Sequence, residues 1–153
     1  MAGILHHISM IIGDVERTVH LYRDLLGFQV IWHQEKVGGG KLSAMLGIPG
    51  FECEMVYLQQ APDGAAVELI RMKAPSMKDF GGLRFGGLGS VALSIKVEDV
   101  ERLHERLKDE GWTPFSDCMN LKTPKGVSLR AFCFATDEGV TVELFQEMTE
   151  SRH

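Results

Sequence analysis

The chain has 153 residues, 44% hydrophobic and 24% charged, which fits one compact globular unit or two small modules sharing a core. Its net charge of −5 argues against a surface that binds nucleic acid or an anionic membrane. No apolar run approaches the roughly 20 residues of a membrane helix and no signal peptide precedes the fold, so we expect a cytoplasmic protein. An odd number of scattered cysteines, Cys53, Cys118 and Cys133, favours buried, reduced thiols.

The opening stretch, residues 4–28, predicts a strand, a capped helix and a glycine stop. Large and β-branched apolar residues surround a histidine pair, and we expect His7 and His6 on opposite faces of the strand. Asp14 is placed to cap the helix, and Gly27 can adopt the left-handed conformation that ends it. Apolar side chains recur at helical spacing between these two signals, at Val15, Val19, Tyr22 and Leu26.

The remainder of the first half predicts three more strands and one short helical turn. The strands are expected at 28–37, 51–59 and 65–72, and the turn at 41–46. Residues 73–90 contain Pro75 and several glycines but no sustained periodicity. We therefore expect this stretch to link the two halves of the chain.

The second half repeats the same order of a strand, a helix and three strands. These elements are expected at 91–97, 98–110, 112–119, 127–135 and 140–146. Val100, Leu103 and Leu107 should face inward from the helix, whereas His104, like His20 on the first helix, is expected in solvent.

Two local alignments support an internal duplication. HISMIIGD at 7–14 matches ALSIKVED at 92–99 without a gap, and DGAAVELI at 63–70 matches EGVTVELF at 138–145. The second alignment gives Glu68 and Glu143 the same place in their halves. A carboxylate within an apolar strand is costly unless it is paired or metal-bound. If a pseudo-twofold axis relates the halves, both carboxylates can converge on one cavity together with His7.

Each of these residues also has a purely structural interpretation. His7 could be a buried imidazole hydrogen-bonded to backbone, and the two glutamates could form ion pairs with Arg71 or Arg130. His33, on the second strand, could line the rim of the cavity or serve as a further ligand.

The motifs HISMIIGD and LYRDLLGF and the DG…VEL and EG…VELF strands resemble the vicinal oxygen chelate superfamily. This superfamily includes glyoxalase I, methylmalonyl-CoA epimerase, extradiol dioxygenases and bleomycin- or fosfomycin-resistance proteins. The resemblance implies an α+β fold in which tandem βαβββ modules form a U-shaped mixed sheet around a cavity. It divides the chain into a first module at 1–72, a linker at 73–90, and a second module with a short tail at 91–153.

The resemblance also implies a metal site. In that family a His or Gln on the first strand and a Glu on the fourth strand of each module hold a divalent metal. His7, Glu68 and Glu143 match three of these positions, and Ala92 occupies the fourth without a donor atom. The implied cofactor is a divalent ion (Zn, Ni, Mn, Co or Fe) with three protein ligands, and the alternative is a site without metal.

Three protein ligands leave open positions, and a metal there polarises a substrate carbonyl or enolate. The resemblance thus implies a lyase or isomerase acting next to a carbonyl of a small organic molecule, with Glu143 or Glu68 as the catalytic base. The alternative is a metal-free protein that sequesters a drug-like molecule. Ala92 disfavours a dioxygenase, since that chemistry usually requires two histidines and one carboxylate.

Relatives of this kind commonly dimerise, so we expect a homodimer whose site is built within one chain or across two. Light scattering at micromolar concentration should give about twice the 17.0 kDa of the chain. A mass equal to that of one chain would contradict this prediction.

Overall fold

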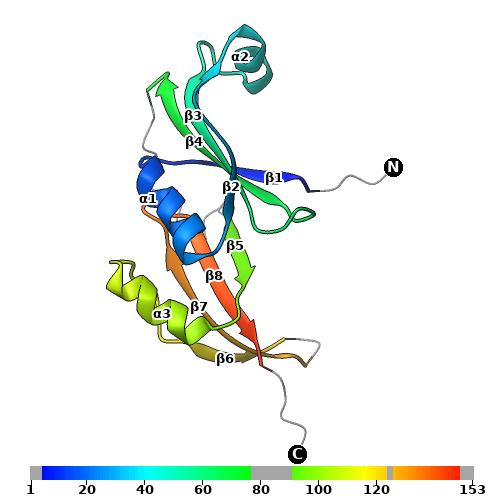
Figure 1. Ribbon diagram of the computed structural model, residues 1–153, viewed down its shortest axis with the longest axis vertical. Helices are drawn as coiled ribbons and strands as arrows, with labels where there is room; N and C mark the ends of the chain where they lie inside the picture. Colours follow the sequence, from blue (N-terminus) through cyan, green and yellow to red (C-terminus); the bar gives the residue numbers. More distant parts are fainter. Residues whose placement is uncertain (1–4, 77–90, 124–125, 149–153) are drawn as a thin grey trace, which may run out of the picture. The chain divides into compact units, whose positions relative to one another are not determined.

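The computed structural model describes residues 5–76, 91–123 and 126–148 (Figure 1). The chain divides into two compact units, Met1–Asp79 and Phe80–His153, and each unit contains a four-stranded mixed sheet. The predicted α+β class with tandem βαβββ modules is therefore confirmed. Most of the predicted linker lies outside the described residues, so the boundaries 1–72, 73–90 and 91–153 stay a prediction, as does the joining of both sheets around one cavity.

The first unit has the strand order β1-β4-β3-β2, in which only the β1–β4 pair is parallel. Its elements are β1 (His7–Ile11), α1 (Val15–His20), η1 (Leu21–Leu25), β2 (Gln29–Gly38), α2 (Gly40–Leu46), β3 (Glu52–Gln59) and β4 (Ala66–Ala74).

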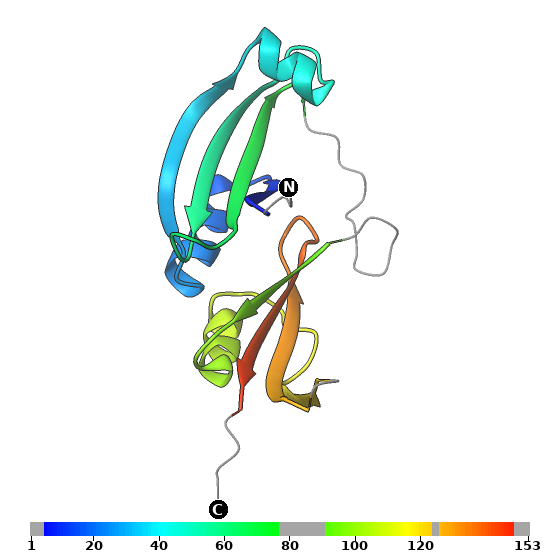
Figure 2. The same cartoon turned by 90° about the vertical axis from the view of Figure 1, so that its right-hand side faces the viewer.

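The second unit repeats this topology with the order β5-β8-β7-β6, and its parallel pair is β5–β8 (Figure 2). Its elements are β5 (Ala92–Lys96), α3 (Val100–Asp109), β6 (Met119–Lys122), β7 (Ser128–Ala135) and β8 (Thr141–Glu147). The register repeats as well, because Ser9 lies beside Glu68 and Ser94 beside Glu143. Strand order and register together support the internal duplication.

The first helix begins as predicted but widens before it ends. The Asp14 side chain caps it by accepting a 2.9 Å hydrogen bond from the backbone N–H of Arg17. The chain then makes a π turn, η1, closed by a bond from the N–H of Leu26 to the carbonyl of Leu21. Leu21 and Tyr22 in this turn are both fully buried. Gly27 follows at a φ of 74°, the conformation expected of a glycine that ends a helix.

In each unit the helix covers one face of the sheet. The Tyr22 hydroxyl contacts Met10 Sδ at 3.9 Å, so the first helix lies on the Met10 face of its sheet. In the second unit the His104 ring stacks edge-on against Phe132 at 4.8 Å between centroids. Side chains that alternate with Met10 and Phe132 therefore project from the opposite faces.

His104 corrects the expectation of a solvated side chain, since it is only 4% exposed. It lies between the fully buried Val100 and Leu107, and its Nε2 atom is 3.1 Å from the carbonyl oxygen of Ser116. The buried stripe of α3 thus follows the spacing 100, 104, 107, and a satisfied imidazole takes the place of an apolar residue.

The prediction of a strand at 112–119 is wrong, because β6 begins only at Met119. Pro114 makes an isolated bridge to Phe134, and the N–H of Phe115 bonds the carbonyl of Cys133 at 2.8 Å. Proline has no N–H with which to continue a ladder, so the pairing does not extend into a regular strand here. Burial of Trp112 and Cys118, rather than strand alternation, explains the apolar residues of this segment.

The three cysteines are free thiols, with Cys53 and Cys118 buried and Cys133 half-buried. Within the described parts of the chain, none of the helices has the length and apolar character needed to cross a membrane.

Glu54, His33 and Arg71 form a polar cluster on the helix-covered face of the first sheet. Glu54 is 8% exposed and accepts hydrogen bonds from His33 Nε2 at 2.9 Å and from Arg71 Nε and Nη2 at 3.0 and 2.7 Å. The register places Tyr57, three residues further along β3, beside Glu68. His33 therefore projects from the face opposite Glu68 and does not join it as a ligand.

We predict that this cluster stabilises the fold in a pH-dependent way. Burial raises the pKa of Glu54, but the hydrogen bonds from His33 and Arg71 outweigh burial and hold that pKa below its ordinary 4.5. A lowered folded-state pKa stabilises the protein above about pH 4.5, and this stability is lost as the pH falls through the folded-state value. Glu54→Gln should lower the free energy of unfolding by about 2 kcal/mol at pH 7.

Urea unfolding between pH 3 and 7 measures this effect. The difference between the native protein and Glu54→Gln should shrink toward pH 3. Glu52→Gln is a matched control, since Glu52 pairs with Lys36, whose side chain is 75% exposed. A Glu54→Gln protein as stable as the native one at every pH would contradict the assignment.

Candidate functional site

Glu68 lies within β4, flanked by Ser9 on β1 and Tyr57 on β3. Directly paired residues project from the same face, so these three side chains share the face that the first helix leaves uncovered. The Ser9 hydroxyl donates a 2.6 Å hydrogen bond to Glu68 Oε2, and His7 Nε2 lies 3.7 Å from the same oxygen. The first unit therefore brings together two of the three predicted ligands.

The geometry of this pair suits a shared cation. Two donor atoms each about 2.1 Å from a metal ion lie at most about 4.2 Å apart, so the 3.7 Å separation fits a single ion between them. The side chain of His7 is 37% exposed and that of Glu68 is 15% exposed. Arg71 bonds Glu54 instead of Glu68, which removes one of the structural interpretations.

The second unit holds Glu143 in an equivalent way. Ser94 lies beside it on β5 and donates a 2.5 Å hydrogen bond to Glu143 Oε2. Ala92 occupies the register position that His7 has in the first unit, as the internal alignment predicted. Arg130 contacts Glu101 and Asn120, so it is not bonded to Glu143.

Two groups in the first unit escaped prediction, Tyr57 and His6. His6 Nδ1 lies 2.9 Å from His7 Nδ1 and 2.9 Å from the Tyr57 hydroxyl oxygen. The expected placement of His6 on the opposite face is wrong, because β1 begins at His7 and strand alternation does not extend to the residue before it. The two serines were also missed, although Ser9 and Ser94 are identical at matching positions of the internal alignment.

The uncovered faces are partly desolvated. Burial raises the pKa of Tyr57, and the charge of Glu68 raises it further, so the phenol keeps its proton at neutral pH. In the second unit burial raises the pKa of the Cys133 thiol, with Glu143 adding to the shift. Cys133 pairs with Glu143 as Tyr57 does with Glu68, so the two units present different side chains at equivalent positions.

Among the described residues, no group of three or more His, Cys, Asp or Glu side chains is arranged to hold a metal ion. The predicted set of His7, Glu68 and Glu143 draws on both units, and its assembly stays a prediction. The donor chemistry of the first unit fits, since an imidazole nitrogen and a carboxylate oxygen are ordinary ligands of divalent transition metals, and the second unit offers the carboxylate of Glu143.

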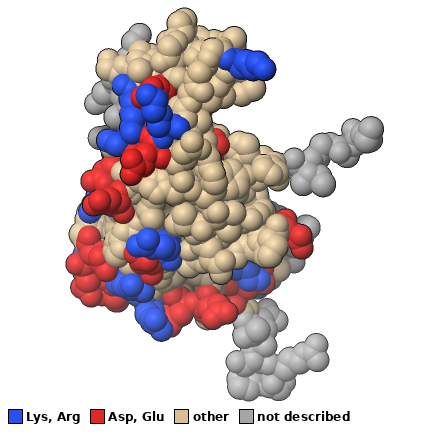
Figure 3. Space-filling view, turned by 45° about the horizontal axis from the view of Figure 1, so that its top comes forward, with Lys and Arg blue, Asp and Glu red and all other residues tan. Residues whose placement is uncertain are grey.

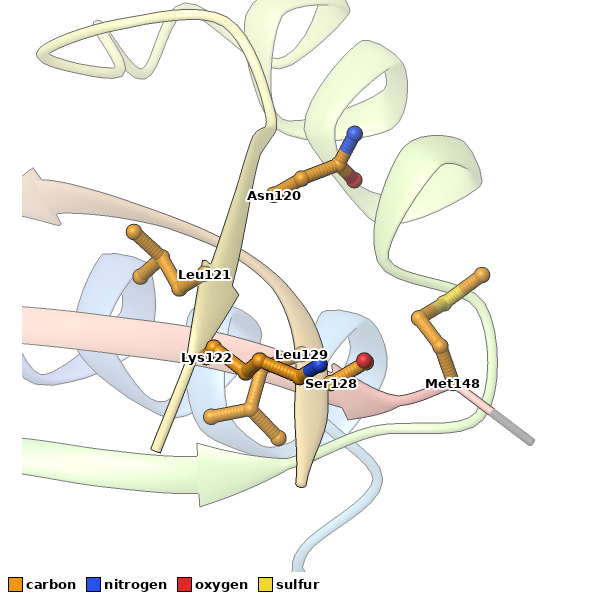
Figure 4. Close-up of a pocket in the computed structure, with 6 residues that line it drawn as sticks. All are labelled: Asn120, Leu121, Lys122, Ser128, Leu129 and Met148. Atoms are coloured by element: carbon orange, nitrogen blue, oxygen red, sulfur yellow. The ribbon is translucent and has the colours of Figure 1, made fainter. Parts of the chain in front are cut away.

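A separate surface pocket of about 450 Å³ opens at one end of the second sheet (Figure 4). Six residues line it, and none of them belongs to the predicted site: Asn120, Leu121, Lys122, Ser128, Leu129 and Met148. On the face shown in Figure 3, described basic and acidic side chains are interspersed, which is unlike a basic patch for nucleic acid.

The fold is shared with solved structures of a glyoxalase family protein, a glyoxalase I and an antibiotic binding protein. A glyoxalase family protein from Bacillus cereus shares 19% identity, with 97% of each chain covered and a TM-score of 0.82. The trypanothione-dependent glyoxalase I of Leishmania major shares 16% identity over 95% of this chain and 87% of its own, with a TM-score of 0.63. An antibiotic binding protein from Streptomyces shares 17% identity over 96% and 98%, with a TM-score of 0.59.

No curated protein sequence matched the chain. At these identities the structural similarities establish the fold, and family membership comes from the sequence itself. Residues 4–144 match the family model of the glyoxalases, bleomycin resistance proteins and dioxygenases. The chain therefore belongs to the Glyoxalase/Bleomycin resistance protein/Dioxygenase superfamily.

Proposed function

We propose that the protein is a divalent-metal-dependent isomerase or lyase acting on a carbon next to a carbonyl of a small organic molecule. The observation that carries this proposal is the His7–Glu68 pair, whose donor atoms lie 3.7 Å apart on neighbouring strands. The equivalent place of Glu143 in the second unit supports a third ligand.

In this proposal His7 and Glu68 hold the cation, and Glu143 completes the site within the chain or from a partner. A bound divalent cation would polarise the substrate carbonyl and so acidify the neighbouring C–H bond. The chain itself must then supply a base for the proton and a partly desolvated face for the substrate.

The two carboxylates differ in one respect that bears on the choice of base. Glu68 has an imidazole beside it, whereas Glu143 has Ala92 at the equivalent position. In each unit a serine hydroxyl bonds Oε2 of the carboxylate, so the neighbouring imidazole is the difference between the two. This difference favours Glu68 as a ligand and Glu143 as the group that accepts the proton.

A metal-free binding protein is the second candidate, and Ala92 is the observation that favours it. Ala92 supplies no donor atom, and the hydroxyl of Ser94 already satisfies one oxygen of Glu143. The fold is shared with an antibiotic binding protein as well as with a glyoxalase I. In this alternative the same faces would bind a small organic molecule without a cation.

We predict that the native protein binds Mn²⁺, Zn²⁺ or Ni²⁺ and that Ala92→His tightens this binding. Ala92 occupies in the second unit the register position that His7 has in the first, so a histidine there should add a fourth donor. The gain should exceed the roughly 10- to 100-fold effect typical of residues in the outer shell of a metal site. Glu143→Gln should weaken binding, and calorimetry of protein purified without a metal-binding tag measures all three.

Ala92→Leu is the matched control, because it adds bulk without a donor atom and should bind no more tightly than the native protein. If the native protein binds none of the three ions and Ala92→His gains nothing, the metal-dependent proposal fails and the binding-protein candidate replaces it.

The proposed chemistry predicts exchange of a substrate proton with solvent. The metal-loaded protein in D₂O should speed the loss of the ¹H NMR signal of the carbon-bound proton in small α-hydroxy ketones such as hydroxyacetone. Glu143→Gln should reduce the exchange rate about 10²- to 10⁴-fold, as expected for loss of a general base. Exchange at the same rate in Glu143→Gln would assign the base elsewhere.

A further inference from the structure

We propose that Ser9 and Ser94 are positioning residues, each of which holds the carboxylate beside it in the orientation that the site uses. The inference rests on the proposed function, in which Glu68 holds the cation and Glu143 accepts the proton. Neither serine belongs to the predicted ligand set. Two short hydrogen bonds at matching places in the two units carry the argument.

Both hydrogen bonds have a defined direction. An ionised carboxylate only accepts, so the serine hydroxyl is the donor in each pair. Ser9 Oγ lies 2.6 Å from Glu68 Oε2, and Ser94 Oγ lies 2.5 Å from Glu143 Oε2. These are the distances of charge-assisted bonds between a hydroxyl and a carboxylate, which are roughly twice as strong as neutral ones. Each glutamate therefore has one oxygen tied to the neighbouring parallel strand.

In the first unit, Ser9 holds the same oxygen that faces the imidazole. Glu68 Oε2 is 2.6 Å from Ser9 Oγ and 3.7 Å from His7 Nε2. A carboxylate oxygen has two lone pairs, so Oε2 can accept the serine proton and still offer a pair to a cation. A glutamate side chain has many rotamers, and the hydrogen bond restricts them. Ser9 thereby sets the separation of the two donor atoms that the proposed function requires.

The neighbour on the other side of each glutamate does not take over this role. Tyr57 lies beside Glu68 and Cys133 beside Glu143, so the two units differ there. The Tyr57 hydroxyl oxygen contacts His6 Nδ1, at 2.9 Å. Within the described parts of the chain, the serine supplies the one hydrogen bond to each carboxylate.

The internal duplication singles out the same serines. When HISMIIGD is aligned with ALSIKVED, only two of the eight positions carry the same residue in both units. One is the aspartate whose side chain caps the following helix, Asp14 in the first unit and Asp99 in the second. The other is the serine, Ser9 or Ser94. Both shared residues therefore make a specific side-chain hydrogen bond.

The first test is the Glu68 carboxylate in the metal-free full chain. In ¹³C NMR spectra of protein labelled at the glutamate Cδ carbon, Glu68→Gln identifies the Glu68 signal by its loss. Ser9→Ala should shift this signal and increase the mobility of the carboxylate, whereas Ser9→Thr keeps the hydroxyl and should preserve both. An unchanged signal in Ser9→Ala would overturn the inference. Ser94→Ala and the Glu143 signal provide the same test if Ser9→Ala misfolds.

Metal titration by calorimetry tests whether this hold matters for binding. Ser9→Ala should lower affinity for Mn²⁺, Zn²⁺ or Ni²⁺ about 10- to 100-fold, the usual effect of removing a group that orients a metal ligand. Ser9→Thr should restore most of the affinity. Ser128→Ala is the matched control, since it removes a strand hydroxyl at the separate surface pocket. Equal affinities in Ser9→Ala and the native protein would overturn the role of Ser9.

Ser94 should act through Glu143 alone, and proton exchange in hydroxyacetone measures this. Ser94→Ala should lower kcat about 10- to 100-fold with little change in KM, because it misplaces the base and leaves substrate binding intact. Ser94→Thr should recover most of kcat. In a Glu143→Gln background, Ser94→Ala should cause no further loss, since no base remains to be positioned. Independent, multiplying losses in the double variant would contradict the inference.

These outcomes separate the inference from the function on which it rests. A native protein that binds none of the three ions, with a Glu68 signal that moves in Ser9→Ala, would support the hold on the carboxylate and defeat the metal-dependent function. Metal binding and proton exchange that are insensitive to both serines would keep the function and overturn the inference.

Discussion

A carboxylate within an apolar strand is the constraint on which the rest of this structure depends. Glu68 and Glu143 each lie between buried neighbours on the fourth strand of their unit, where an unpaired charge is costly. In each unit a serine hydroxyl from the parallel neighbouring strand donates a hydrogen bond that stabilises the carboxylate. Because the helix covers the other face of each sheet, both carboxylates lie on the face that the helix of their own unit leaves uncovered.

Both units contain the same serine–carboxylate pair, but the side chains around that pair differ. The first unit adds a hydrogen-bonded set of His6, His7 and Tyr57 beside its carboxylate. The second unit places Ala92 and Cys133 at equivalent positions, and its carboxylate has fewer polar neighbours. In the function that we propose, the first unit holds the cation and the second contributes a carboxylate. Such a division of roles suits a site that needs open positions for substrate.

The sequence predicted the fold well because its signals are local and repeated. Alternating apolar residues, Asp14 as a cap and the gap-free internal alignments are enough to predict the order of elements along the chain and the equivalence of Glu68 with Glu143. The failures lie where tertiary contacts override local pattern. His104 is buried against Phe132 in place of an apolar residue, and Pro114 stops the strand predicted around it. His6 precedes its strand, so alternation could not place it next to His7 and Tyr57.

The central claim is that one cation lies between His7, Glu68 and Glu143, whether the glutamates come from one chain or two. Anomalous diffraction from a crystal soaked in Mn²⁺ tests it most directly. The account predicts a single anomalous peak within about 2.0–2.4 Å of His7 Nε2 and of a carboxylate oxygen from each glutamate. A peak bound elsewhere, or one that leaves the Glu143 carboxylate remote from His7 and Glu68, would contradict it.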